Sequence, residues 1–269
     1  MSSGFSIEAT RPGRFRAPTD PRYWNQIGPF GGWLAGLAVA ALQREAPGGW
    51  PLRAVTLQFL GRLPAGSIDI EVERLRLQRR VAGLRATLQP EGHMGVAVTA
   101  EAVFGEAGPG APSTQRQRPV LPDPVTLPRL TSLDALAAFV RTIDHRVAFG
   151  LPFARGGAAR SGGWLRSREP LPEGPAALLL LADAWFPPRW ATSSQPVPVS
   201  TVSMQVVFHD VAPGPDSTDG FFAACHEEDA CTEGFGLERG TLWWPDGRLA
   251  LTMQQLTWIG QTAGPKDHA

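Results

Sequence analysis

The sequence predicts an α+β protein made of two tandem modules, each with one central helix wrapped by an antiparallel β-sheet. A segment rich in Pro, Gly, Ser and Gln, residues 105–132, divides the 269-residue chain into halves of similar length. Each half contains one strongly apolar helical stretch, followed by several segments with the alternation or the β-branched content of strands. The turns Pro-Glu-Gly at 90–92 and Pro-Asp-Gly at 245–247 fall at matching places before the last strand of each half, which indicates a tandem duplication.

The first module, residues 1–115, is expected to hold a helix over 31–46, with the sequence GGWLAGLAVAALQREA. An extended segment, FSIEATRPGRFRA, precedes this helix, and a meander of strands follows it. Strands are expected at 54–63, 67–77, 81–89 and 95–104. Because consecutive strands joined by hairpins form antiparallel sheets, and the helix needs apolar cover all round, the sheet is expected to wrap the helix.

The second module, residues 116–269, repeats this order. Two extended segments, 141–149 and 164–170, precede an Ala- and Leu-rich helix within the apolar run 176–186. Strands are then expected at 200–210, 220–230, 236–244 and 248–259. A sheet that wraps one helix, built twice in one chain, is the double hotdog fold.

Composition and charge exclude several classes of function. The content of 43% hydrophobic and 19% charged residues is typical of a globular protein. Since 25 basic residues balance 25 acidic ones, no net charge attracts nucleic acid. The N-terminal residues lack the pattern of a signal peptide and no apolar stretch reaches the ~20 residues of a membrane span, so we expect a cytoplasmic protein. Cys225 and Cys231 have no His or Cys cluster nearby, so neither a disulfide framework, a metal nor a cofactor is expected.

Asp183 is the single carboxylate in the apolar run AALLLLADAWF, 176–186. An ionised side chain in such a helix must be paired, hydrogen-bonded or in contact with water, because isolated burial costs several kcal/mol or raises the pKa. Buried carboxylates with shifted pKa values serve as general bases. Two structural alternatives stay open: Asp183 lies on the solvent-facing edge of the helix, or it satisfies backbone groups without doing chemistry.

The segment WNQIGPFGGWLAGLAVAAL, 24–42, resembles the N-terminal signature of the TesB-like thioesterase II family of acyl-CoA thioesterases, which are double-hotdog enzymes. The resemblance extends over most of the chain, including the segments 57–80, 141–150 and 162–187. It implies hydrolysis of acyl-CoA thioesters, an acyl-CoA substrate and a role in lipid metabolism. It also implies catalytic residues, matched one by one to Asp183, to Thr201 upstream of a Phe-His pair, and to Gln254 on the last strand.

Two departures from the family pattern bear on substrate preference. Ser203 and Gln205 stand where the family has Asp and Ser, and Gln255-Leu256 stands where it has Glu-Gly. Thr201 and Asp183 align with leucines of the first module, Leu52 and approximately Leu34. The polar set is therefore asymmetric, and we expect one active site per chain where the modules meet.

Thioester hydrolysis needs an oriented water, a base, and donors for the developing oxyanion. Asp183 can accept the proton of the water, while Thr201 and Gln254 can orient it. The Gly-rich turn before the first helix, with Phe30, Gly31 and Gly32, is the candidate oxyanion or substrate-binding element, because N–H groups at a helix start suit a negative oxygen. The alternative for these glycines is close packing of the loop before the helix.

Two other functions are weighed against hydrolysis. Enoyl-CoA hydration needs an Asp and a His with the spacing D-x-x-x-x-H, whereas Asp144 and His145 are adjacent, so hydration is not expected. A non-catalytic protein that binds acyl-CoA or another acyl ligand would share the fold, and fold alone does not exclude it. Since hotdog modules leave sheet edges that invite association, we expect a homo-oligomer.

Overall fold

The computed structural model describes residues 4–93, 95–108, 114–211 and 220–260. Its first half contains helix α1 (Gly31–Glu45), which confirms the helix predicted over 31–46. The short 3-10 helix η1 (Pro21–Tyr23) precedes α1. The strands of this half are β1 (Glu8–Arg11), β2 (Arg14–Pro18), β3 (Leu52–Phe59), β4 (Ser67–Leu77), β5 (Val81–Pro90) and β6 (Val98–Gly105).

The second half contains helix α2 (Pro175–Asp183). Its strands are β7 (Ile143–Phe149), β8 (Arg160–Ser167), β9 (Val199–Phe208), β10 (Phe222–Thr232), β11 (Phe235–Trp243) and β12 (Leu249–Ile259). Three 3-10 helices accompany them: η2 (Pro124–Thr126), η3 (Phe139–Thr142) and η4 (Pro188–Ala191). Within the described part of the predicted linker 105–132, η2 is the only helix and no strand begins; residues 109–113 lie outside the described residues.

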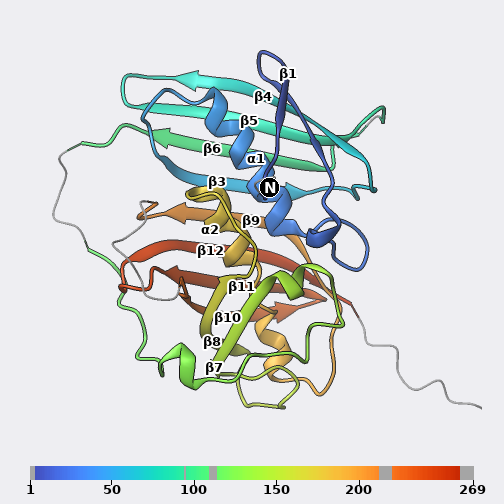
Figure 1. Cartoon of the computed structure of the whole chain (residues 1–269), viewed down its shortest axis with the longest axis vertical. Helices are drawn as coiled ribbons and strands as arrows, with labels where there is room; N and C mark the ends of the chain where they lie inside the picture. Colours follow the sequence, from blue (N-terminus) through green and yellow to red (C-terminus); the bar gives the residue numbers. More distant parts are fainter. Residues whose placement is uncertain (1–3, 94, 109–113, 212–219, 261–269) are drawn as a thin grey trace, which may run out of the picture.

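The twelve strands that the structure describes form one antiparallel sheet in the order β1-β2-β4-β5-β6-β3-β9-β12-β11-β10-β8-β7. The halves join where β3 pairs with β9, from Ala54 opposite Val207 to Gln58 opposite Ser203. Figure 1 shows the upper half of the sheet, β1 to β6, continuing into the lower half, with both helices against the sheet. The double hotdog fold predicted from the sequence is confirmed, and the junction removes one exposed edge from each half.

The two helices pack against each other and form the centre of the core. The eight residues of α2 before Asp183 are all buried, and so is most of α1. Burying each large aliphatic side chain contributes about 1.5–3 kcal/mol, so these apolar helices hold the two halves together. With 15 and 9 residues, α1 and α2 are too short for a membrane span, and no other described helix is longer.

The strands alternate between an inner face toward the helices and an outer face toward solvent. On β12, Met253, Gln255 and Thr257 are buried, whereas Gln254 and Leu256 are exposed. Since side chains on a strand point alternately to opposite faces, this register decides which of the two adjacent glutamines reaches the interior.

Candidate active site

Asp183 is the last residue of α2 and lies where the two halves meet. It keeps part of its surface exposed, in contrast to the eight buried residues before it, although protein atoms surround its carboxylate. The carboxylate accepts a hydrogen bond from the backbone N–H of Gly32 in the first turn of α1. An acid at this position is stabilised by the positive end of the α1 dipole. The side chain of Asp183, in the second half, thus caps the N-terminal end of α1 in the first half.

Gln255 connects Asp183 to Thr201 by two hydrogen bonds. Its Nε2 donates to Asp183 Oδ1 at 2.8 Å. Its Oε1 accepts a hydrogen bond from Thr201 Oγ1 on β9 at 2.7 Å. The second N–H of the amide lies 3.2 Å from the sulfur of Met253, so both amide hydrogens have partners. Gln255 is only 5% exposed, and its amide therefore holds the carboxylate in one orientation.

The structure does not bring Gln254, the predicted site residue, to Asp183 and Thr201; the adjacent Gln255 lies there instead. Gln254 is exposed on the outer face of the sheet, opposite Arg239 and Gln205 of the neighbouring strands. Its side chain points away from α2 because it is next to the inward-facing Gln255. The sequence contained a partial signal: Leu249, Leu251 and Met253 are apolar at odd numbers, which favours Gln255 on the inner face, but Leu256 and Trp258 are apolar at even numbers and obscure this pattern.

In the Gly-rich turn before α1, most of the groups expected to bind an oxyanion make contacts within the protein instead. The N–H of Phe30 donates to Tyr23 O at 2.8 Å, and its ring stacks on Phe139 at a centroid distance of 4.0 Å. Phe30 is therefore not a free donor, which corrects its assignment to the oxyanion. The N–H of Gly32 is taken by Asp183. Gly31 is partly exposed and borders the site, since a Cβ at this position would lie 3.1 Å from Asp183 Oδ2.

The environment of Asp183 shifts its titration toward neutral pH. Burial raises the pKa of Asp183 to about 7, and the hydrogen bonds from Gln255 and Gly32 oppose this rise. A carboxylate that titrates near 7 is a suitable general base at neutral pH, because it is ionised in a large fraction of molecules and still accepts a proton readily.

Glu238 is a second buried carboxylate near Asp183, and the sequence interpretation missed it. It lies on the inner face of β11, opposite Gln255 of β12 and Glu228 of β10. It is 6% exposed, and its Oε1 has no hydrogen-bond partner within the described part of the chain. Burial raises the pKa of Glu238 to about 8, with smaller contributions from the charges of Glu228 and Asp183. The available signal was a glutamate between Gly236 and Gly240, in register with the buried Leu242.

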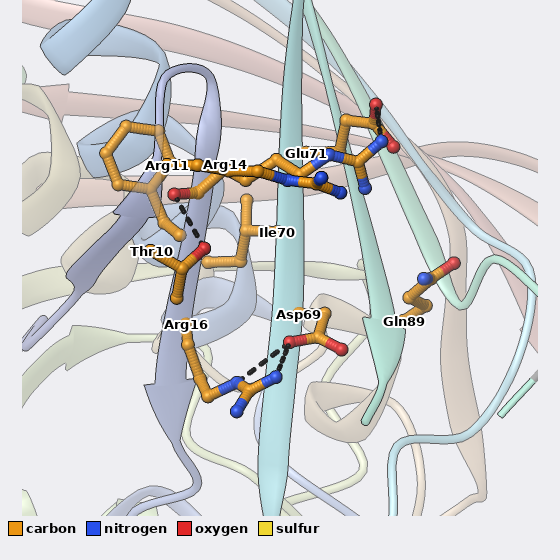
Figure 2. A pocket seen from close by; sticks show the side chains of 9 residues that line it. Thr10, Arg11, Arg14, Arg16, Asp69, Ile70, Glu71 and Gln89 are labelled. Atoms are coloured by element: carbon orange, nitrogen blue, oxygen red, sulfur yellow. Dashed lines mark hydrogen bonds and ion pairs between the residues drawn. The ribbon is translucent and has the colours of Figure 1, made fainter. Parts of the chain in front are cut away.

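A groove with a cavity volume of about 260 Å³ lies at the other end of the sheet, on β2 and β4. Figure 2 shows that ion pairs occupy it: Arg16 pairs with Asp69 at 2.9 Å, and Arg14 pairs with Glu71. Its strands are separated in the sheet from the strands that carry Thr201 and Gln255. It is therefore a surface feature separate from the candidate active site.

The fold and the position of the buried carboxylate define a double-hotdog protein with its candidate site at the junction of the modules. Family models for the acyl-CoA thioesterase N-terminal domain and the acyl-CoA thioesterase C-terminal domain match residues 20–105 and 109–259. The chain belongs to the acyl-CoA thioesterase family. This result confirms the resemblance seen in the sequence.

Solved structures with the same fold cover nearly the whole chain. A hotdog-fold protein of unknown function from Alicyclobacillus acidocaldarius is 24% identical, with a TM-score of 0.86 over 97% of this chain and 98% of that one. A putative thioesterase II from Thermobifida fusca is 20% identical, with a TM-score of 0.82 over 96% of each chain. The acyl-CoA thioesterase II TesB2 from Mycobacterium marinum is 21% identical, with a TM-score of 0.75 over 97% of this chain and 98% of that one. Among curated protein sequences no match is found.

Proposed function

We propose that the protein hydrolyses acyl-CoA thioesters to a free acid and coenzyme A, with Asp183 as the base that activates water. One observation carries the proposal: the carboxylate of Asp183, surrounded by protein atoms and fixed by Gln255 and Gly32, has a pKa of about 7 at the junction of the modules. Membership of the acyl-CoA thioesterase family supports the substrate class.

In this mechanism Asp183 removes one proton from a water molecule as the water oxygen attacks the thioester carbonyl carbon. The carbonyl π electrons move to oxygen and give a tetrahedral oxyanion. When the oxyanion collapses, the C–S bond breaks, and the proton held by Asp183 passes to the departing sulfur. The products are the acid and the free thiol, and Asp183 returns to its ionised form.

Gln255 and Thr201 act in this proposal by positioning the base. Because Thr201 donates to Oε1, the amide of Gln255 must present its N–H groups toward Asp183. The hydrogen bond to Oδ1 fixes the carboxylate and leaves Oδ2 on the side of Gly31. We assign the N–H of Gly31 as a donor to the oxyanion, where the N-terminal end of α1 favours negative charge.

Replacement of Asp183 by asparagine tests the proposal. Asp183→Asn keeps the shape of the side chain but removes the base, so kcat is expected to fall by about 100-fold or more. Thiol release from acyl-CoAs of several chain lengths measures the effect. The matched control is Asp246→Asn, which changes an exposed turn carboxylate and should leave kcat unchanged.

Two outcomes would contradict the proposal. One is a wild-type protein that releases no thiol from any acyl-CoA; tight binding of acyl-CoA in that case would favour the non-catalytic acyl-CoA-binding alternative. The other is an Asp183→Asn variant with full activity.

We further propose that copies of the chain associate in a homo-oligomer, as part of a cytoplasmic enzyme of lipid metabolism. The sheet ends at β1 and β7, and the unpaired backbone groups of such strands invite pairing with another chain. Light scattering that gives the mass of a single chain at micromolar concentration would contradict the association.

A further inference from the structure

We infer that Glu238 controls the charge of the candidate site: its neutral carboxyl group and the Asp183 carboxylate together carry one negative charge, and activity falls when Glu238 ionises. This inference rests on the proposed hydrolysis at Asp183. It adds to that proposal a second carboxyl group, on strand β11, that limits activity at high pH.

The register of the sheet places Glu238 beside the group that holds Asp183. Glu228, Glu238 and Gln255 lie opposite one another on three adjacent strands, β10, β11 and β12. Side chains directly opposite on one face of antiparallel strands have Cβ atoms about 4.5–5.5 Å apart. Glu238 is therefore an immediate neighbour of Gln255, whose amide donates to Asp183.

Among the described residues, the cation that acts on Glu238 is Arg189, and its charge lowers the pKa of Glu238 by less than burial, Glu228 and Asp183 raise it. On β10, Glu228 is held by Arg189 of η4, with Arg189 Nε 2.9 Å from Glu228 Oε2 and a second, shorter contact. His226 of β10 is neutral near pH 7, because burial lowers its pKa to about 3. Helix α2 contributes Asp183, and β12 has no titratable residue. Glu238 Oε1 has no hydrogen-bond partner among the described residues, which is the arrangement of a carboxyl group kept in its neutral form.

Two neighbouring buried carboxyl groups do not ionise together at low energetic cost. Burial raises the pKa of Asp183 to about 7, and burial together with the charges of Glu228 and Asp183 raises the pKa of Glu238 to about 8, so Asp183 loses its proton first and Glu238 second. In the interval between the two steps the base is ionised and Glu238 is neutral. At pH values above this interval, the ionised Glu238 adds a second buried negative charge. This charge repels the oxyanion that develops in the transition state and weakens the stabilisation of that oxyanion.

The pH dependence of kcat/KM tests this inference. For the wild type we expect a profile that rises near pH 7 with the ionisation of Asp183 and falls near pH 8 with that of Glu238. Glu238→Gln is neutral at every pH, so its falling limb should disappear, and its ratio of kcat/KM at pH 9 to that at pH 7 should exceed the wild-type ratio by about tenfold. The matched control is Glu227→Gln. Glu227 precedes Glu228 on β10 and pairs with Arg239 outside the site, so this variant should keep the falling limb.

A second measurement does not depend on activity. In carboxyl ¹³C NMR of protein labelled at glutamate, one signal that titrates above pH 7 should be present in the wild type and missing in Glu238→Gln. The inference is overturned by a falling limb that persists in folded Glu238→Gln, by loss of that variant's activity at all pH values, or by a Glu238 signal that titrates near 4.5. Failure of the proposed function is a distinct result, since the wild type would then release no thiol or Asp183→Asn would stay active.

Discussion

At the scale of single residues, the candidate site depends on the amide of Gln255. Its two ends contact different strands and a helix: Oε1 accepts from Thr201, and Nε2 donates to Asp183. A buried amide with satisfied donors restricts a neighbouring carboxylate more strongly than a surface hydrogen bond does, because the local dielectric is low. Loss of this amide therefore changes both the orientation and the pKa of Asp183.

We predict that Gln255→Met reduces kcat by about 10- to 100-fold, because a side chain of similar length no longer donates to the base. The hydrogen bond from Gln255 lowers the pKa of Asp183, so its removal should also move the rising limb of the pH profile to higher pH. Steady-state thiol release measured across pH checks both effects. Gln254→Met, on the exposed outer face, is the control and should behave like the wild type. The opposite result, with Gln254 essential and Gln255 dispensable, would contradict the arrangement derived from the structure.

The sequence indicated some of these residues and not others, for physical reasons. Asp183 was visible because a carboxylate in an apolar helix has few structural explanations. The choice between Gln254 and Gln255 depends on a one-residue strand register, and alignment to a family motif shifted it by one. Glu238 lies in GLERGTLWW on the same strand face as Leu242, but its neighbours Glu228 and Gln255 follow only from the pairing of β11 with β10 and β12.

At the scale of elements, the end of α2 and the start of α1 form one unit. Gly32 lies against Asp183, and a Cβ there would come within 2.8 Å of both the Asp183 Cβ and the Phe30 ring. Gly32 therefore fits the alternative considered for these glycines from the sequence, which is close packing of the loop before the helix. The glycine lets the helix end approach closely enough for its N–H to reach the carboxylate.

We predict that Gly32→Ala destabilises the protein by about 1–3 kcal/mol, because the added methyl group pushes α1 and α2 apart. The same displacement removes the hydrogen bond to Asp183, so kcat should fall together with the free energy of unfolding. Urea denaturation and thiol release measure the two quantities. Gly48→Ala is a suitable control, because a Cβ at Gly48 meets nothing within 4 Å. Equal stability of the two variants would show that the helix contact tolerates a larger residue.

Close approach of strands also explains why the bounds expected for β8 from the sequence were displaced. The segment 164–170 was expected to be extended, whereas β8 runs over Arg160–Ser167. It includes Gly162 and Gly163, residues that local propensity disfavours in strands. A Cβ on Gly163 would lie 2.1 Å from Arg146 O, and one on Gly162 would lie 2.5 Å from the Phe149 ring. Tertiary contact with β7 therefore selects glycine here, and a pattern of strand propensities does not detect it.

At the scale of the whole molecule, buried titratable groups make folding stability depend on pH in two opposite ways. Asp183 and Glu238 have raised pKa values in the folded protein. Above about pH 4, close to their ordinary pKa values, these groups have therefore lost their protons in the unfolded chain but keep them in the folded protein. Stability then falls as pH rises, until the folded groups ionise near 7 and 8. His145 and His226 have pKa values lowered by burial to about 4 and about 3, so below 6.5 the unfolded chain binds protons that the folded protein does not. These histidines make stability rise with pH up to 6.5 and offset the carboxyl groups in that range.

Above pH 6.5 the contribution of the two histidines to the slope fades, because the imidazoles of the unfolded chain are half deprotonated at that pH, and the carboxyl groups then determine the slope. We therefore predict that the wild type loses stability between pH 6.5 and pH 8.5, and that Glu238→Gln loses less. Because the glutamine never ionises, the variant should be more stable than the wild type at pH 8.5 by on the order of 1–3 kcal/mol. Urea denaturation at pH 7 and pH 8.5 measures the difference, with Glu227→Gln, a partly exposed carboxylate paired with Arg239, as the control that leaves the pH dependence unchanged. A wild type whose free energy of unfolding is the same at both pH values would show that these carboxyl groups titrate near their ordinary pKa values. If the slope is present and Glu238→Gln reduces it, the same buried charge that limits the proposed hydrolysis at high pH also limits the stability of the fold.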